Sequence, residues 1–284
     1  MLKQRVITAL VLLAILLPAL VYPDPVAFCA VVLLLVAAGA WEWGRLNGYT
    51  QTASWLAALA CVLLCALSWA LGWLQIPLSG LWTAVGGVWV MVGAWLLARG
   101  VAHWPAIARS VRLWAGLLAL SLAWLAMAQA RVIGVNFLLS ILVLVWVADI
   151  FAYFAGRTWG GRFSKGKLAP GISPGKTWEG VWGGMVGVLL LAVVWVAADR
   201  FWAASVPSFY SQLARRGTWL LVLAVLFVAA MSVVGDLVES LVKRAAGVKD
   251  SSGLLPGHGG VLDRLDALLP TLPIAMMLYS LGAV

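Results

Sequence analysis

The chain of 284 residues is dominated by long apolar runs that are almost free of charged residues and recur from one end to the other. Each run has roughly 16 to 22 residues, about the length that a helix needs to cross ~30 Å of hydrocarbon. Short segments between the runs hold most of the charged residues. We predict nine membrane-spanning helices, at about 6–21, 26–41, 54–74, 81–98, 113–130, 132–149, 181–198, 218–236 and 267–283.

Helices are favoured in these runs because the lipid interior offers no hydrogen-bonding partners to backbone N–H and C=O groups. No segment alternates apolar and polar residues over ten positions, as the strands of a membrane barrel do. Only 10% of the residues are charged and the mean hydropathy is +1.03, whereas water-soluble domains have about 25% charged residues. The sequence therefore predicts an all-α, polytopic membrane protein and excludes an ordinary water-soluble domain.

The first run has two interpretations. Lys3 and Arg5 precede it, as basic residues precede the apolar part of a cleaved signal peptide. However, the segment LPALVYPDP lacks a convincing small-x-small cleavage site, and another apolar run follows at once. We therefore predict a retained first helix.

Lysine and arginine residues are distributed unequally between the two sides of this arrangement. If the N-terminus is cytoplasmic and the chain crosses nine times, 15 of the 19 lysines and arginines face the cytoplasm and four face outside. The positive-inside rule favours this orientation, which places loops 155–180 and 240–266 at the cytoplasmic edge of the cell's inner membrane. The net charge of +9 also suits anionic lipid head groups. The outside residues are Arg131, Arg200, Arg215 and Arg216, and the cytoplasmic residues are Lys3, Arg5, Arg45, Arg99, Arg109, Arg112, Arg157, Arg162, Lys165, Lys167, Lys176, Lys243, Arg244, Lys249 and Arg264.

The two halves of the chain differ in character. Residues 1–130 are apolar helices joined by short loops, and we interpret them as a scaffold, a lipid-facing wall or the interface of a homodimer. Within this half, Glu42 and Arg45 lie one helical turn apart and are expected to form an ion pair. Residues 131–284 hold the candidate chemistry and are interpreted as the catalytic region. We expect no nucleic-acid partner.

Candidate chemistry begins at Asp149, which ends the sixth apolar run. A carboxylate at this depth is a functional candidate, and the alternative is a structural ion pair with Arg157 or with a neighbouring cation of the loop. The following loop, RTWGGRFSKGKLAPGISPGKTWEG, contains five cations and six glycines, without the spacing of a P-loop. Glycines let backbone N–H groups approach phosphate oxygens, although membrane topology alone also explains a basic loop. We therefore give weight to Ser173, Lys176 and Glu179 only together with a second loop.

That second loop begins where the eighth run ends. If the helix continues through DLVESLVKRAAG, five polar residues fall within an arc of about 140°, and Gly247 is expected to cap the helix. An i,i+4 pair between Glu239 and Lys243 is the structural alternative, but it does not explain an aspartate at the membrane boundary. The five residues are Asp236, Glu239, Ser240, Lys243 and Arg244.

The glycine-rich segment KDSSGLLPGHGG follows and is interpreted as a shaped loop, after which Asp263, Arg264 and Asp266 open the last apolar run. Asp263 and Asp266 are three residues apart, so a helix directs both the same way. Such oxygen ligands suit Mg²⁺, which binds through one or two carboxylates and substrate phosphates. Zinc is disfavoured because His258 has no cysteine or second histidine nearby in the sequence. Cations available to neutralise phosphate groups are Lys243, Arg244, Lys249 and Arg264.

This region resembles the signature of the phosphatidate cytidylyltransferase (CDP-diacylglycerol synthase) family. The upstream elements DxxAYFxGR from Asp149, SPGKTWEG from Ser173 and GDLxES from Gly235 are also similar to the pattern of this family. Together these elements cover the C-terminal half of the chain. The signature residues are Ser240, Lys243, Arg244, Lys249, Asp250, Ser252, Leu255, Pro256, His258, Gly259, Gly260, Asp263, Arg264, Leu265 and Asp266.

The resemblance implies transfer of CMP from CTP to phosphatidate, with release of pyrophosphate. It implies Asp236 and Asp263 as ligands of Mg²⁺, with Asp266 and Glu239 as further ligands of this ion or of a second cation. The implied partners are CTP, phosphatidate and anionic membrane lipids. The implied catalytic residues are Asp236, Asp263, Lys243, Arg264 and Asp266, and the implied substrate-binding residues are Ser173, Lys176, Ser240, Arg244, Lys249, His258 and Asp149.

Two other classes of protein stay open at this stage. One is a different lipid enzyme: the DGxxAR core of CDP-alcohol phosphotransferases is absent, and a CTP-dependent lipid kinase would leave CDP instead of pyrophosphate. The other is a transporter that uses Asp149 and Asp236 as a cation pathway. A transporter predicts charges near the middle of the membrane on broken helices, whereas these charges lie towards one edge.

Overall fold

The computed structural model describes residues 2–281, and most of them are helical. Each predicted apolar run corresponds to one helix, so the all-α prediction is confirmed. Residues 282–283, at the end of the last predicted run, lie outside the described residues, as do the side chains of Lys3 and Arg5. The elements are α1 (Leu2–Val21), α2 (Pro25–Leu46), α3 (Gln51–Ala70), α4 (Ser79–Arg99), the 3₁₀ helix η1 (Val101–Ala106), α5 (Arg109–Ile133), α6 (Val135–Trp159), β1 (Lys167–Ala169), β2 (Ser173–Thr177), α7 (Trp178–Phe201), α8 (Phe209–Arg216), α9 (Thr218–Ala245), α10 (Leu262–Leu265) and α11 (Leu268–Ser280).

Seven of the described helices are long and apolar enough to span a membrane, namely α2 to α7 and α9. The apolar part of α1, Val6–Val21, is shorter. Helix α11 has 13 residues and therefore extends over only about 20 Å. A multi-pass arrangement is supported, but nine spanning helices are not confirmed.

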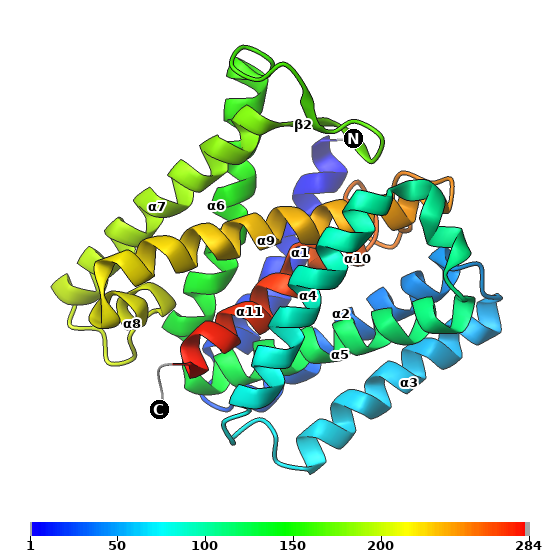
Figure 1. Cartoon of the computed structure of the whole chain (residues 1–284). Coiled ribbons are helices and arrows are strands. Elements are labelled where there is room, and N and C mark those ends of the chain that lie inside the picture. The colour runs from blue at the N-terminus through cyan, green and yellow to red at the C-terminus, as the bar shows by residue number, and fades with distance from the viewer. Residues whose placement is uncertain (1, 282–284) are drawn as a thin grey trace.

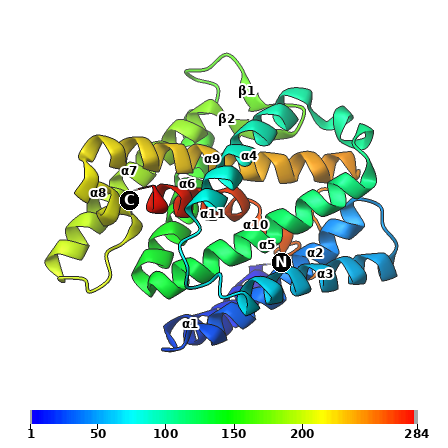
Figure 2. The same cartoon turned by 60° about the horizontal axis from the view of Figure 1, so that its bottom comes forward.

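The last helix, α11, is buried inside the bundle. Leu272, Ile274 and Ala275 are fully buried, and the helix packs against α4 and α5 from the first half of the chain and against α9 from the second. Figure 2 shows α11 in the middle of the molecule. The two halves therefore share one core, and α11 is surrounded largely by protein.

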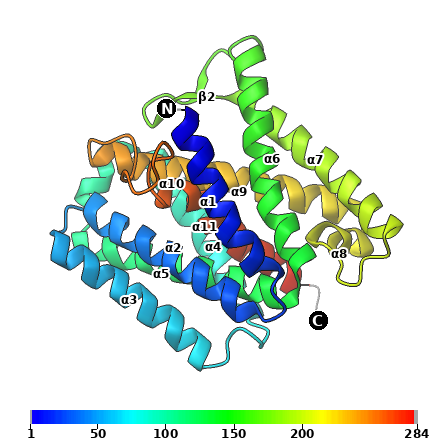
Figure 3. The same ribbon diagram turned by 180° about the vertical axis from the view of Figure 1, so that it is seen from behind.

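Helix α1 lies on the surface of the bundle, where it packs against α2 (Figure 3). Most of its apolar side chains are exposed. Near its start, Thr8 Oγ1 donates to the carbonyl of Pro256 at 2.9 Å. At its end, the guanidinium of Arg131 donates to the carbonyls of Leu20 and Tyr22 at 3.0 and 2.5 Å. These contacts join both ends of α1 to the rest of the bundle.

The loops gather at two opposite ends of the bundle. In Figure 1 the turns that follow α2, α4, α6 and α9 lie towards the top and right, and α8 lies at the lower left. This grouping matches the alternation of loops predicted from the lysine and arginine residues. Contacts at the first end join Glu42 to Ser251, Arg109 to Gly48 and Arg244 to Ile172, and contacts at the second end join Gln129 to Trp73, Asn136 to Asp199 and Arg216 to Leu278.

The basic loop 155–180 contains a short β hairpin that we did not predict. Strands β1 and β2 are antiparallel, with Lys167 opposite Thr177. The flanking helices α6 and α7 approach closely: a Cβ atom on Gly184 would lie 2.9 Å from the carbonyl oxygen of Ala148. Cβ atoms are essentially never found this close to another atom, so this position requires glycine. Since β2 also packs against α9, the hairpin brings its side chains to that helix.

Helix α9 continues to Ala245, as predicted, and carries the polar face beyond its apolar part. Gly247 follows with φ of +72°, and its N–H bonds to the carbonyl of Arg244 at 3.0 Å. The left-handed conformation favours glycine at this position. The predicted cap is therefore confirmed, and it directs the chain into the glycine-rich loop.

Candidate active site

A cavity of about 420 Å³ lies between α6, α7, α9 and the β hairpin. Its lining combines apolar side chains of the three helices with charged groups. Its volume is in the range of small-molecule sites, about 300–1,000 Å³. The charged residues are Asp149, Arg157, Lys176 and Asp236, and the apolar residues include Ala148, Ala152, Val181, Met185, Ala229 and Val233.

At this cavity the two carboxylate oxygens of Asp236 contact two different side chains. Lys176 Nζ, from β2, lies 2.5 Å from Asp236 Oδ2, and Ser240 Oγ donates to Asp236 Oδ1 at 3.2 Å. Asp149 lines the same cavity. Asp149 and Arg157 are both described and form no ion pair; Arg157 instead donates to Tyr153 Oη at 2.8 Å. The structure thus brings together two distant segments that the sequence predicted to meet.

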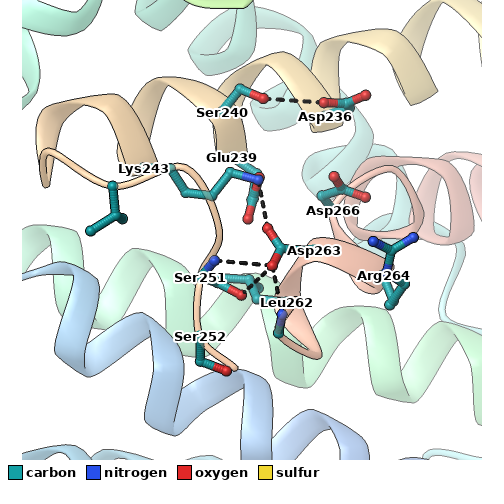
Figure 4. A network of polar contacts seen from close by, with 12 residues as sticks. Asp236, Glu239, Ser240, Lys243, Ser251, Ser252, Leu262, Asp263, Arg264 and Asp266 are labelled. Atoms are coloured by element: carbon teal, nitrogen blue, oxygen red, sulfur yellow. Dashed lines mark hydrogen bonds and ion pairs between the residues drawn. The ribbon is translucent and has the colours of Figure 1, made fainter. Parts of the chain in front are cut away.

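A second polar cluster is centred on Lys243, near the end of α9 (Figure 4). Lys243 Nζ lies 2.5 Å from Glu239 Oε2 and 2.6 Å from Asp263 Oδ1, and all three side chains are largely buried. Asp263 Oδ2 accepts hydrogen bonds from the N–H and hydroxyl of Ser251 and from the N–H of Gly260, at 2.7–3.0 Å. The predicted i,i+4 pair is confirmed, and Asp263 extends it into the glycine-rich loop.

These contacts favour the ionised form of Asp263. Burial alone raises the pKa of a carboxyl group, but Lys243 and the N–H groups of Gly260 and Ser251 lower the pKa of Asp263 below its ordinary value. Three donors occupy one oxygen and an ammonium group occupies the other. The arrangement argues for Asp263 as an anchor of the loop, and its role as a metal ligand stays a prediction.

Asp266 lies where the two clusters meet. Its Oδ1 accepts the N–H of Ala267 at 2.7 Å, and in Figure 4 its carboxylate lies between Asp236 and Arg264. Burial and the negative charge of Asp236 raise the pKa of Asp266 to about 8. Asp263 faces Lys243 of α9, and Asp266 faces Asp236 of the same helix. Both side chains therefore point towards α9, as their spacing of three residues predicts.

Arg264 and His258 shape the glycine-rich loop itself. Arg264 Nη2 donates to the carbonyl of His258 at 2.8 Å. The N–H of His258 donates to the carbonyl of Leu255 at 2.8 Å, which closes a tight turn. Both residues therefore have a structural task beside the substrate-binding role that the resemblance implies.

The other predicted phosphate-binding residues lie around the two clusters. Arg244 Nε reaches the carbonyl of Ile172 at 3.4 Å, which links α9 to the hairpin loop. Ser173 begins β2, and Lys249 is exposed in the loop after α9. Glu179 accepts hydrogen bonds from the N–H groups of Phe163 and Ser164, so it shapes the loop before the hairpin.

Glu42 is a residue whose role we did not predict. The expected ion pair with Arg45 is wrong: the Arg45 guanidinium lies over the ring of Trp41, 4.9 Å from its centroid. Helical spacing allowed the pair, but the fully buried Glu42 faces the loop after α9 instead. The available signal was a carboxylate at the end of an apolar run, the same signal that marked Asp149. Groups that donate to Glu42 are the N–H of Val261 and Leu262 and the hydroxyl of Ser252, and the hydroxyl of Ser251, which donates to Asp263, lies 3.2 Å from Oε2.

The donor set fits a magnesium ion that is held partly by substrate. Asp236 lines the cavity, and the carboxylate of Asp266 lies towards it in Figure 4. Within residues 2–281, no three His, Cys, Asp or Glu side chains are arranged to hold a metal by themselves. Mg²⁺ characteristically binds through one or two carboxylates and phosphate oxygens, which Asp236 and Asp266 can satisfy.

Fold and site together define a class: multi-pass membrane proteins in which carboxylates and cations border an amphipathic cavity. A family model described as "Cytidylyltransferase family" matches residues 3–281. This chain belongs to the cytidylyltransferase family.

Two relatives are similar over nearly the whole chain, and a third is similar over about half of it. A protein of Pseudomonas aeruginosa named phosphatidate cytidylyltransferase is 39% identical over 291 aligned residues, which cover 99% of this chain and 98% of the relative. A protein of Haemophilus influenzae with the same name is 35% identical, with 98% and 99% of the two chains covered. A Bacillus subtilis protein of that name is 39% identical over 148 residues, or 52% of this chain and 49% of the relative.

Proposed function

We propose that this chain transfers the CMP group of CTP to phosphatidate, forming CDP-diacylglycerol and releasing pyrophosphate. The observation that carries the proposal is the near full-length similarity to proteins named phosphatidate cytidylyltransferase. The cavity supports it, because apolar walls suit the lipid and the cations Lys176 and Arg157 suit phosphate groups.

The reaction makes few covalent demands on the protein. An oxygen of the phosphatidate phosphate attacks the α-phosphorus of CTP, and pyrophosphate leaves roughly in line with the attack. A phosphate monoester is already largely anionic at neutral pH, so no protein base is required. Positioning and charge neutralisation are the main contributions of the protein.

We assign the cations to the two substrates by their location. Lys176 and Arg157 line the cavity and bind the lipid phosphate there. Lys249, Arg244 and Arg264 lie on or beside the glycine-rich loop and bind the triphosphate. Each of these groups can offer several donors to phosphate oxygens.

The metal site is part of the proposal. Asp236 and Asp266 would hold Mg²⁺, which when bound would neutralise phosphate charge and stabilise the departing pyrophosphate. Glu239 Oε1, which accepts no hydrogen bond from the described residues, is the candidate ligand of a second cation. Lys243 keeps Glu239 and Asp263 neutralised beside this site.

We further propose that the site faces the cytoplasm at the inner membrane, where CTP is present. The support is the distribution of lysine and arginine residues, 15 of 19 on the predicted inner side. The net charge of +9 supports contact with anionic lipids. A homodimer, which would cover exposed side chains such as Leu10 of α1, stays a prediction.

A cysteine introduced at position 253 tests the orientation. A Cβ atom at Gly253 meets nothing within 4 Å, and the three native cysteines are buried. In intact cells the Gly253→Cys variant should resist an impermeant thiol reagent and react after permeabilisation. Ser205→Cys, exposed at the other end of the bundle, should react in intact cells. Ready labelling of Gly253→Cys before permeabilisation would reverse the proposed orientation.

The reaction is tested with CTP labelled at different phosphates. Purified protein is incubated with phosphatidate, Mg²⁺ and CTP labelled at either the α- or the γ-phosphate. We expect the α-label to enter the lipid fraction and the γ-label to stay in water as pyrophosphate. Transfer of the γ-label to lipid would instead identify a lipid kinase, and no transfer of either label would contradict the proposed function.

A further inference from the structure

We infer that Glu42, in the N-terminal half of the chain, is a positioning residue for the active-site loop 249–264 and thereby sets the affinity for CTP. The inference rests on the proposed function. Glu42 touches neither the cavity nor the carboxylate of Asp236, so its influence passes through the loop.

Both carboxylate oxygens of Glu42 are engaged by this loop. The N–H of Leu262 donates to Oε2 at 2.6 Å, and the N–H of Val261 donates to Oε1 at 3.0 Å. The hydroxyl of Ser251 lies 3.2 Å from Oε2, and that of Ser252 donates to Oε1. Glu42 thus contacts the beginning and the end of one loop, at residues 251–252 and 261–262.

The burial of Glu42 makes these hydrogen bonds essential. Its side chain is fully buried, and the ion pairs among the described residues do not include it. A buried carboxylate without donors is strongly unfavourable. Since the donors belong to residues 251–262, the carboxylate requires the ordered loop, and the loop is held in one conformation by the carboxylate.

The loop backbone also approaches Glu42 too closely for a side chain. A Cβ atom on Gly260 would lie 2.5 Å from Glu42 Oε1 and 2.0 Å from Ser251 Oγ. Glycine at this position is therefore a requirement of the contact. The loop backbone at Gly260 therefore packs directly against the carboxylate of Glu42.

Ser251 connects this contact to the second polar cluster. Its hydroxyl lies between Glu42 and Asp263, 2.9 Å from Asp263 Oδ2, and Asp263 pairs with Lys243 of α9. The loop bears Lys249 and Arg264, which we assign to the triphosphate. A change at Glu42 should therefore displace the groups that we assign to CTP. It should leave in place the cavity between α6, α7 and α9, which we assign to phosphatidate.

Substitution Glu42→Gln tests this inference, because glutamine has the same size but offers donors where the loop also offers donors. We expect KM for CTP to rise by about tenfold or more, with KM for phosphatidate and kcat changed by less than about threefold. Hydrogen exchange at the amides of Val261 and Leu262 should also become faster. The conservative variant Glu42→Asp should give an intermediate shift. The matched control is Arg45→Ala on the same helix, which should leave KM for CTP unchanged.

The possible results separate this role from simple stabilisation. A loss of active protein with both KM values unchanged would show a purely structural role and overturn the inference. If Glu42→Gln does not fold, Glu42→Asp and Ser252→Ala must still raise KM for CTP, and unchanged values in both would overturn it. If the wild-type protein transfers no label from CTP, the proposed function fails. Independently of that result, unchanged exchange at the amides of Val261 and Leu262 in Glu42→Gln would show that Glu42 does not position the loop.

Discussion

Replacing Asp236 with asparagine is expected to slow formation of CDP-diacylglycerol by about 10²–10³-fold while the protein remains folded. The change keeps the size of the side chain but removes the charge that pairs with Lys176 and that we assign to Mg²⁺. Asp236 is partly exposed at the cavity, so little packing is lost. The measurement is the rate of transfer of α-labelled CMP to lipid over a range of Mg²⁺ concentrations, together with a melting curve.

Ser240→Ala is the matched control for this prediction. It removes the hydroxyl that donates to the other oxygen of Asp236 at 3.2 Å but leaves the carboxylate in place. Its rate should fall by no more than about tenfold, the effect of a single hydrogen bond. If Asp236→Asn instead keeps the wild-type rate at saturating Mg²⁺, Asp236 is not a ligand of a catalytic metal.

The helices could be predicted from the sequence because a run without charges has one stable conformation in lipid. The same argument leaves the number of spanning helices unconfirmed, since composition does not distinguish a helix facing lipid from one buried in protein. Helix α11 is apolar because it is enclosed by α4, α5 and α9. The hairpin was missed for a different reason: its strands have three and five residues, too few for a periodic pattern.

Contacts within the site became harder to predict as the separation of their residues along the chain increased. Glu239 and Lys243 are one turn apart on α9, and their pairing follows from helical geometry alone. The convergence of Lys176 on Asp236 spans 60 residues and was expected from the shared membrane side of the two loops. No such rule joins Glu42 to Leu262, which are 220 residues apart, because that contact depends on how α2 packs in the finished bundle.

Lys243→Met is expected to lower the free energy of unfolding by about 3–5 kcal/mol, the usual cost of removing one partner from a buried ion pair. Methionine retains the apolar stem but removes the ammonium group between Glu239 and Asp263. Asp263 keeps three donors from Ser251 and Gly260, so most of the cost falls on Glu239. Denaturant unfolding in detergent micelles, followed by circular dichroism, measures the change.

A second substitution shows where this cost arises. The double variant Lys243→Met with Glu239→Gln removes the charge left without a partner, so it should recover a large part of the lost stability. We expect both variants to use CTP poorly, because in each of them Asp263 lacks the cation that joins the loop to α9. Equal stability of Lys243→Met and the wild type would mean that the buried pair contributes nothing to the stability of the fold.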